Sequence, residues 1–223
     1  MGENVTVLVM AAPRRGAVSE RCRASIEASD IGTKYEWHEH PQGVTVLAHY
    51  RAIMDRARTA PTRLVLFLED DALVNRHILE NVRTWTDVED PRFGVGWLIN
   101  PGGAAFSIID YIYGRRHDGR GRWLRRPNLH CSAGLLFRRA DLPELLRHVY
   151  SWQDTVGGSL PHTDLAVSHA IRAVGRRICV HVPSLVEHQL SPSLLGHHHQ
   201  PRWHTSNGNF MMGWLRADLR KRP

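Results

Sequence analysis

An apolar run that ends in three consecutive acids constrains this chain more than any other feature. Residues 64–68 read Leu-Val-Leu-Phe-Leu, which is typical of a buried strand, and Glu69, Asp70 and Asp71 follow it directly. Adjacent carboxylates repel one another, and a divalent metal ion is the usual countercharge. Ligands of an open α/β sheet bind in the crevice beyond the carboxyl ends of its strands. The sequence therefore predicts a metal-binding acidic cluster at the mouth of such a sheet.

A plainer interpretation of the same acids stays open at this point. Acidic residues after a strand often begin a helix, where their carboxylates complement the positive end of the helix dipole. Residues 71–74, Asp-Ala-Leu-Val, fit a helix start as well. The three acids alone do not decide between a helix start and a metal site, so the choice depends on the rest of the chain.

Segments with a strand pattern alternate with segments of helical pattern along the chain. The expected strands cover residues 5–10, 35–39, 63–68, 93–99 and 178–182, with a return to the core over 129–138. The expected helices cover residues 18–28, 46–58, about 75–84, 142–152 and 164–174. This alternation predicts the α/β class, a Rossmann-type sandwich with a mostly parallel central sheet flanked by helices. No repeat or linker divides the 223 residues, so we expect one domain over 1–223.

Composition favours a protein of the cytoplasm. No apolar run approaches the ~20 residues that a membrane-spanning helix needs. The apolar segment 5–12 has no basic residues before it, so it reads as a strand rather than a signal peptide. The three cysteines, Cys22, Cys131 and Cys179, have no metal-ligand spacing and suit free thiols in a reducing compartment.

The positive charge of the chain favours anionic ligands or partners. The net charge is +7, and Lys34 and Lys221 are the only lysines, so arginine carries nearly all of it. Guanidinium groups suit phosphate recognition, although a bias in genome composition would produce the same excess. The charge is concentrated in a loop or hairpin over residues 114–126, which contains six arginines and Trp123.

Four motifs in order resemble those of the GT-A-type glycosyltransferases. They are Glu69-Asp70-Asp71, Ser132-Ala133-Gly134, Asp164 in His-Thr-Asp, and His188 at the end of Pro-Ser-Leu-Val-Glu-His. The family has a metal-binding Asp-x-Asp-like triplet, a small-residue loop, an acid at a helix start and a C-terminal histidine. The resemblance spans roughly residues 5–196, and glutamate at the first acidic position departs from the pattern. It implies a GT-A-like fold with a nucleotide-binding half, about 1–105, and an acceptor-side half, about 106–223.

The resemblance implies a divalent ion on the diphosphate of a nucleotide-sugar, with a UDP-sugar as the expected donor. Such an ion stabilises the charge of the leaving group as a Lewis acid. The implied ligands are Asp71 and His188, with Glu69 binding directly or through water. Oxygen ligands suit Mg²⁺ or Mn²⁺, and one imidazole favours Mn²⁺. An ordinary surface or core histidine after a strand is the alternative for His188, because the chain has 15 histidines.

The resemblance also implies a catalytic base and contacts to the donor. Asp164 would take the proton of the acceptor hydroxyl, which implies inversion at the anomeric carbon; an ordinary first-turn aspartate is the alternative. The residues expected to contact the donor are Asp70, Arg14, Arg15, Arg51, Ser132, Gly134 and Ser193. For each arginine alone, a solvated surface position is the competing interpretation.

The acceptor is the least constrained part of the hypothesis. Arginines beside an aromatic side chain suit a nucleic-acid groove, and small phage-type sugar transferases modify hydroxymethylated pyrimidines in DNA. The residues expected to contact the acceptor are Arg115, Arg116, Arg120, Arg122 and Trp123. A glycan or lipid-linked saccharide is an equal alternative acceptor. A nucleotidyltransferase would use the same phosphate and metal chemistry and is the alternative reaction.

Overall fold

The computed structural model describes residues 5–12, 16–99, 122–123, 129, 131–181 and 184–189. Within these ranges a seven-stranded sheet has the order β2-β1-β3-β7-β5-β8-β6. Its strands are β1 (Val5–Met10), β2 (Glu36–His38), β3 (Leu64–Glu69), β5 (Phe93–Trp97), β6 (Arg122–Trp123), β7 (Gly134–Arg138) and β8 (Arg177–Val180). Only β6 and β7 run against the common direction of the other five. The predicted α/β class with a mostly parallel sheet is therefore confirmed.

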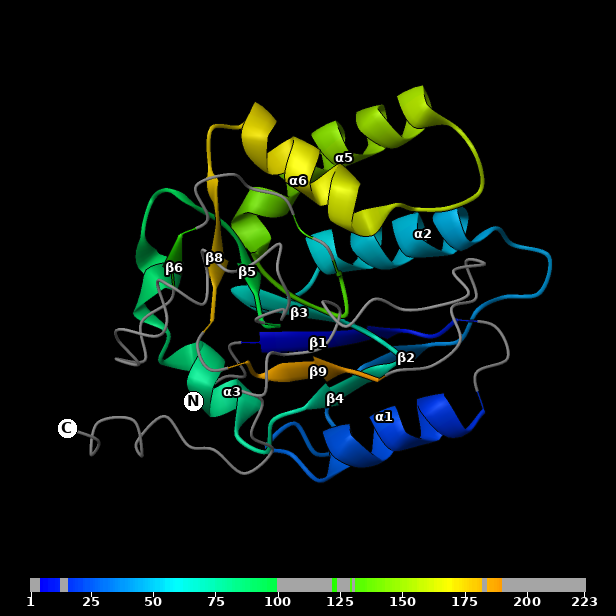
Figure 1. The fold of residues 1–223 in the computed structure, drawn as a ribbon, viewed down its shortest axis with the longest axis vertical. Helices are drawn as coiled ribbons and strands as arrows, with labels where there is room; N and C mark the ends of the chain where they lie inside the picture. Colours follow the sequence, from blue (N-terminus) through cyan, green and yellow to red (C-terminus); the bar gives the residue numbers. More distant parts are fainter. Residues whose placement is uncertain are drawn as a thin grey trace, which may run out of the picture.

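Helices cover both faces of this sheet. The helices are α1 (Ala17–Glu27), α2 (Val46–Arg58), α3 (Ile78–Arg83), α5 (Leu142–Val156) and α6 (Thr163–Ala173), with 3₁₀ turns η1 (Thr86–Glu89) and η3 (Arg139–Asp141). In Figure 1, α2, α5 and α6 lie on one side of the sheet, and α1 and α3 lie on the other. The helix expected over 46–58 has those ends. It begins at Val46 because the Thr45 hydroxyl accepts the backbone N–H of Ala48 and so caps its first turn.

The centre of the core is β3, as its apolar sequence predicts. Side chains 64–68 are at most 1% exposed, because β1 and β7 pair with the two edges of the strand and helices cover its faces. The phenyl ring of Phe67 packs edge-on against the ring of Tyr50 from α2. Because β3 is an inner strand, the acids that follow it lie near the middle of the row of strand ends. We call this row of carboxyl ends the carboxyl edge of the sheet.

A second, two-stranded sheet lies beside the acids and was not expected from the sequence. It joins β4 (Ala72–Val74) to β9 (Val186–His188) as an antiparallel pair in which Ala72 lies opposite His188. The alternative that residues 71–74 begin a helix is therefore wrong, since residues 72–74 are a strand. Pairing with a segment far along the chain decides this conformation, and no local pattern reports it.

The cysteines and the helices bear on two expectations from composition. Cys22, Cys131 and Cys179 are free thiols, as expected, and all three are buried. None of the helices in the described ranges is long and apolar enough to cross a membrane.

Candidate metal centre

One strand, β3, places the acids at the carboxyl edge of the sheet, beside the end of its parallel neighbour β1. Glu69 is the last residue of β3 and lies opposite Met10, the last residue of β1. Beyond the strand, the N–H of Asp70 still donates to the carbonyl of Met10 at 3.1 Å. The side chains of Asp70 and Asp71 are each only 1% exposed. Burial of adjacent carboxylates is costly, which indicates that a positive partner belongs to this site.

The small β4–β9 sheet brings an imidazole to the acids. Because Ala72 pairs with His188, the histidine lies next to Asp71, and its Nε2 is 3.2 Å from Asp71 Oδ2. Potential ligand atoms of Glu69, Asp71 and His188 all lie within 4.8 Å of one another. Atoms bound to one ion at about 2.1–2.2 Å lie at most ~4.4 Å apart. The three groups thus fit a single divalent ion after a small adjustment of their side chains.

The negative charges of the acids raise the pKa values of two buried thiols nearby. Burial raises the pKa of the Cys131 thiol well above its usual value, and the charges of Glu69, Asp71 and Asp164 raise it further. Burial also raises the pKa of Cys22, followed by the charges of Asp70 and Asp71. The acids therefore act together on their surroundings, and a cation at their centre would relieve the repulsion among them.

Hydroxyl groups hold two of the acids in place. Ser132 Oγ donates to Glu69 Oε1, and Ser19 Oγ from the first turns of α1 donates to Asp70 Oδ2 at 2.6 Å. The expected contact of Ser132 with the donor stays a prediction, and its described partner is Glu69, a candidate metal ligand. Asp70, which was expected to bind the donor, is tied to α1. Ser19 was not singled out from the sequence, where nothing relates it to residues 51 positions away.

Gln189 connects the histidine strand to α1 and was also missed. Its backbone N–H donates to the carbonyl of Asp71 at 2.8 Å. Its side-chain oxygen accepts Arg21 Nε at 2.7 Å, and its side-chain nitrogen donates to the carbonyl of Val18 at 3.1 Å. The residue is only 6% exposed. These bonds hold the end of β9, and with it His188, against both α1 and Asp71.

Gly134 is placed for packing between β7 and β9. A Cβ atom on this residue would come within 2.7 Å of Val186 Cγ2 and 3.0 Å of Val186 Cβ. The absence of a side chain thus allows β9 to lie close to β7. The expectation that Gly134 lets a sugar approach stays a prediction, and the contact with Val186 supplies a structural reason for glycine at this position.

Asp164 lies in the first turn of α6 and is partly exposed. One carboxylate oxygen accepts the N–H of Leu165 at 2.8 Å. Because its charge acts on the Cys131 thiol together with those of Glu69 and Asp71, it belongs to the same electrostatic neighbourhood as the acidic cluster. His162, the residue that precedes this helix, has a left-handed backbone (φ 41°), which is uncommon outside glycine.

Arg51 is engaged between two helices. Its guanidinium donates to Gln153 Oε1 at 3.1 Å, to the carbonyl of Tyr150 at 3.2 Å and to Asp154 Oδ1 at 2.6 Å. All three acceptors are on α5, so these contacts join α2 to α5. The predicted contact of Arg51 with a donor gains no support from them.

Several predicted residues have no described side chain. Arg14, Arg15, Ser193, Arg115, Arg116 and Arg120 lie outside the described residues. Arg122 and Trp123 form β6, whose backbone pairs with Val180 and Cys179 of β8. The predicted roles of these residues in donor or acceptor binding therefore stay predictions.

Comparison with known proteins yields structural likeness without sequence relatives. No family model matches the sequence, and no curated protein matches it. A glycosyltransferase involved in glycosylation of the major capsid of PBCV-1 is similar over 81% of this chain and 83% of its own, at 16% identity and a TM-score of 0.49. The galactosyltransferase LgtC, in complex with donor and acceptor sugar analogs, is similar over 84% of this chain and 88% of its own, at 14% identity and a TM-score of 0.44.

A cytidylyltransferase from Leptospira borgpetersenii is also similar, over 78% of this chain and 71% of its own, at 11% identity and a TM-score of 0.40. Glycosyltransferases and a nucleotidyltransferase are thus both among the similar structures. At these identities and scores the likeness carries no argument about function. The case for function therefore depends on the chemistry of the group formed by Glu69, Asp71 and His188.

Proposed function

We propose that this chain is a metal-dependent glycosyltransferase that moves a sugar from a nucleotide-diphosphate sugar to an acceptor hydroxyl. The observation that carries the proposal is the group of half-buried Glu69 with buried Asp71 and His188 at the carboxyl edge of the sheet. Carboxylates repel a diphosphate unless a cation lies between them. A group of this composition at a ligand-binding edge suits an anionic substrate that brings or shares a divalent ion.

Each residue of the group has a separate task in this proposal. Asp71 and His188 hold the ion, and Glu69 completes its ligands directly or through water. When bound, Mn²⁺ or Mg²⁺ supplies Lewis acidity toward the diphosphate leaving group. Asp70, oriented by Ser19, contacts the ribose of the donor, for which a UDP-sugar is the first candidate. The nucleotide is bound by the half over about 1–105, and the acceptor by the half over about 106–223.

Asp164 is the proposed general base. A carboxylate in the first turn of a helix can accept the proton of an acceptor hydroxyl as that oxygen attacks the anomeric carbon. The nucleoside diphosphate leaves from the opposite face of the sugar, so the configuration inverts. The partial exposure of Asp164 and its shared influence on Cys131 support this role.

For the acceptor we keep a hydroxymethylated pyrimidine in DNA as the first candidate. Its support is the net charge of +7 and the cluster of arginines around Trp123 over residues 114–126, which suit phosphate neutralisation and base stacking. A glycan or lipopolysaccharide-type saccharide is the second candidate. Neither candidate has a contact among the described residues that favours it.

A panel of nucleotide-sugars with Mn²⁺ tests the reaction. We expect one donor to release its nucleoside diphosphate slowly, with loss of release in EDTA and in Asp71→Asn. Release of pyrophosphate from a nucleoside triphosphate and a sugar phosphate would identify the alternative, a nucleotidyltransferase. If neither product forms with any donor in the presence of Mn²⁺ or Mg²⁺, the proposed function is wrong.

The acceptor requires a second assay with the donor found in the first. Duplex DNA that contains hydroxymethylated pyrimidine is compared with the same DNA without the hydroxymethyl group and with a set of oligosaccharides. Stimulation by the hydroxymethylated duplex alone supports the DNA acceptor. Stimulation by a saccharide alone replaces it with the second candidate while leaving the glycosyl-transfer proposal in place.

A further inference from the structure

A cavity lies at the opposite edge of the sheet from the acids. It has a volume of about 400 Å³ and lies beside Val5, the first residue of β1, whereas the acids follow the last residue of β3. The buried side chains of Val5, Ile31 and Leu79 form its apolar floor. This volume lies in the range of pockets that hold small molecules. The cavity takes no part in the proposed transfer reaction.

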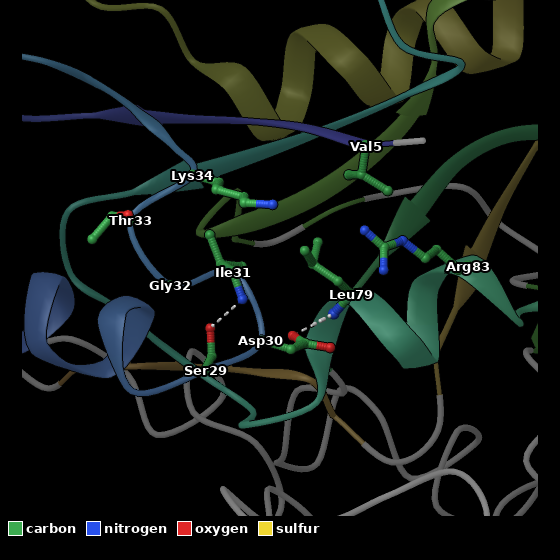
Figure 2. Close-up of a pocket in the computed structure, with 9 residues that line it drawn as sticks. All are labelled: Val5, Ser29, Asp30, Ile31, Gly32, Thr33, Lys34, Leu79 and Arg83. Carbon is green, nitrogen blue, oxygen red and sulfur yellow. Dashed lines mark hydrogen bonds between the residues drawn. The ribbon is translucent and has the colours of Figure 1, made fainter. Parts of the chain in front are cut away.

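Two cationic side chains reach this cavity from different elements. Figure 2 shows that the amine of Lys34 and the guanidinium of Arg83 extend toward the cavity from opposite sides. Lys34 comes from the loop after α1, and Arg83 is the last residue of α3. Lys34 is one of only two lysines in the chain. An ammonium and a guanidinium on the two sides of one hollow favour an anion between them.

The acid that lines the cavity is already engaged elsewhere. Asp30 accepts the backbone N–H of Leu79 with one carboxylate oxygen at 2.9 Å and that of Glu80 with the other at 2.8 Å. These bonds hold the carboxylate at the start of α3 (Figure 2). The charge at Asp30 therefore serves the helix, and the two cations outnumber the one acid among the residues that line the cavity.

We propose that this cavity binds a phosphate-bearing small molecule, with Lys34 and Arg83 on the phosphate and the apolar floor against its ring or carbon part. The combination of a cationic rim and a floor of valine, isoleucine and leucine selects against inorganic anions, which have no apolar part to bury. The site is independent of the acidic group at the other edge, so it needs no divalent ion. It goes beyond the proposed function and does not depend on it.

Calorimetric titration with UMP and AMP in EDTA tests the proposal, with the parent nucleosides and inorganic phosphate as matched probes. We expect saturable binding of at least one nucleoside monophosphate that weakens as salt is added, because exposed charges are screened. Its nucleoside and inorganic phosphate should each bind at least tenfold more weakly. No saturable binding of UMP or AMP, or equal affinity for inorganic phosphate, would overturn the proposal.

Variants place the binding in the cavity. The double substitution Lys34→Ala with Arg83→Ala is expected to weaken binding of the monophosphate at least tenfold. Arg147→Ala, which removes another exposed arginine on α5, should leave this binding unchanged. Both cavity cations are exposed, so the melting temperature is expected to stay near that of the parent chain. Binding that survives the double substitution contradicts the assignment of the site.

One more variant separates this site from the proposed active site. Asp71→Asn should remove metal-dependent release of nucleoside diphosphate and leave monophosphate binding in EDTA intact. Loss of monophosphate binding in Asp71→Asn would show that the binding depends on the acidic edge and would overturn the cavity assignment. A chain that binds the monophosphate in the cavity but cleaves no donor would refute the proposed function alone.

Discussion

At the carboxyl edge of the central sheet the charged groups are buried acids, whereas at the amino edge they are exposed cations around an apolar floor. Asp70 and Asp71 are each 1% exposed, and Lys34 and Arg83 lie on the surface. Buried carboxylates can meet a phosphate only through a cation, because their own charge repels it and little water screens them. Exposed cations meet a phosphate directly and weakly, in competition with salt.

The two edges also differ in how firmly their side chains are held. At the acidic edge, Ser19, Ser132 and Gln189 orient the acids and the histidine strand through hydrogen bonds from other elements. At the cationic edge, both side chains are long and exposed, so binding must immobilise them at a cost in rotamer entropy. We therefore expect ion-dependent, geometrically exacting chemistry at the first edge and modest binding at the second.

Removing a candidate ligand should have the largest effect. Asp71→Asn is expected to lower metal-dependent kcat/KM by about 10²–10³, since metal ligation contributes several kcal/mol to charge stabilisation. Steady-state release of nucleoside diphosphate measures it. In the parent chain, Mn²⁺ at about 100 times its Kd should stabilise the fold by about 2.7 kcal/mol, or roughly 5–10 °C. A parent-like Mn²⁺ shift in Asp71→Asn contradicts its role as a ligand.

Removing the proposed base should affect transfer but not donor binding. Asp164→Asn keeps the size and the helical position of the side chain, so Kd for the donor with Mn²⁺ should stay within about twofold. Transfer to the acceptor should fall by about 10²–10⁴ because the proton has no acceptor. Donor titration and single-turnover transfer give the two values. Normal transfer by this variant would mean that another group accepts the proton.

Crowding the contact between β7 and β9 tests how the histidine is placed. In Gly134→Ala the new methyl group meets Val186 at 2.7 Å, which should cost roughly 1–3 kcal/mol of unfolding free energy and weaken Mn²⁺ binding. Thermal unfolding with and without Mn²⁺ measures both. The double variant with Val186→Ala makes room for the methyl group, so it should recover part of the Mn²⁺ affinity. If the double variant does not recover Mn²⁺ affinity, the packing of Gly134 against Val186 does not control metal binding.

The smallest effect is expected from the residue that holds the end of β9. Gln189→Met keeps the length of the side chain and removes its bonds to Arg21 and Val18. Groups that orient metal ligands typically contribute 10–100-fold to metal affinity, and we expect the low end, about tenfold, with little change in melting temperature. Arg23→Ala is the control, because Arg23 lies on α1 like Arg21 but pairs with Glu39. An unchanged Mn²⁺ affinity in Gln189→Met would mean that Gln189 contributes to packing but does not orient the metal ligands.

Much of the fold was predictable because its elements form from local patterns. The alternation and apolar runs predict β1, β3 and α2 with their observed ends or within a residue of them. The acids at the end of β3 were predicted to lie at the mouth of the sheet, and they do, because they follow the carboxyl end of an inner strand.

By contrast, the assembly of each charged site depends on chain segments that no local pattern connects. The pairing of Ala72 with His188 turns 72–74 into a strand and brings the imidazole to Asp71. The bond between Arg21 and Gln189 joins residues 168 positions apart, and the cavity between Lys34 and Arg83 exists only where α1's following loop meets α3. The sequence by itself determined which residues carry charge and which runs are apolar, because both are local properties. Only the tertiary structure decided which charges meet, because burial of the apolar faces brings distant segments together and leaves their polar ends side by side.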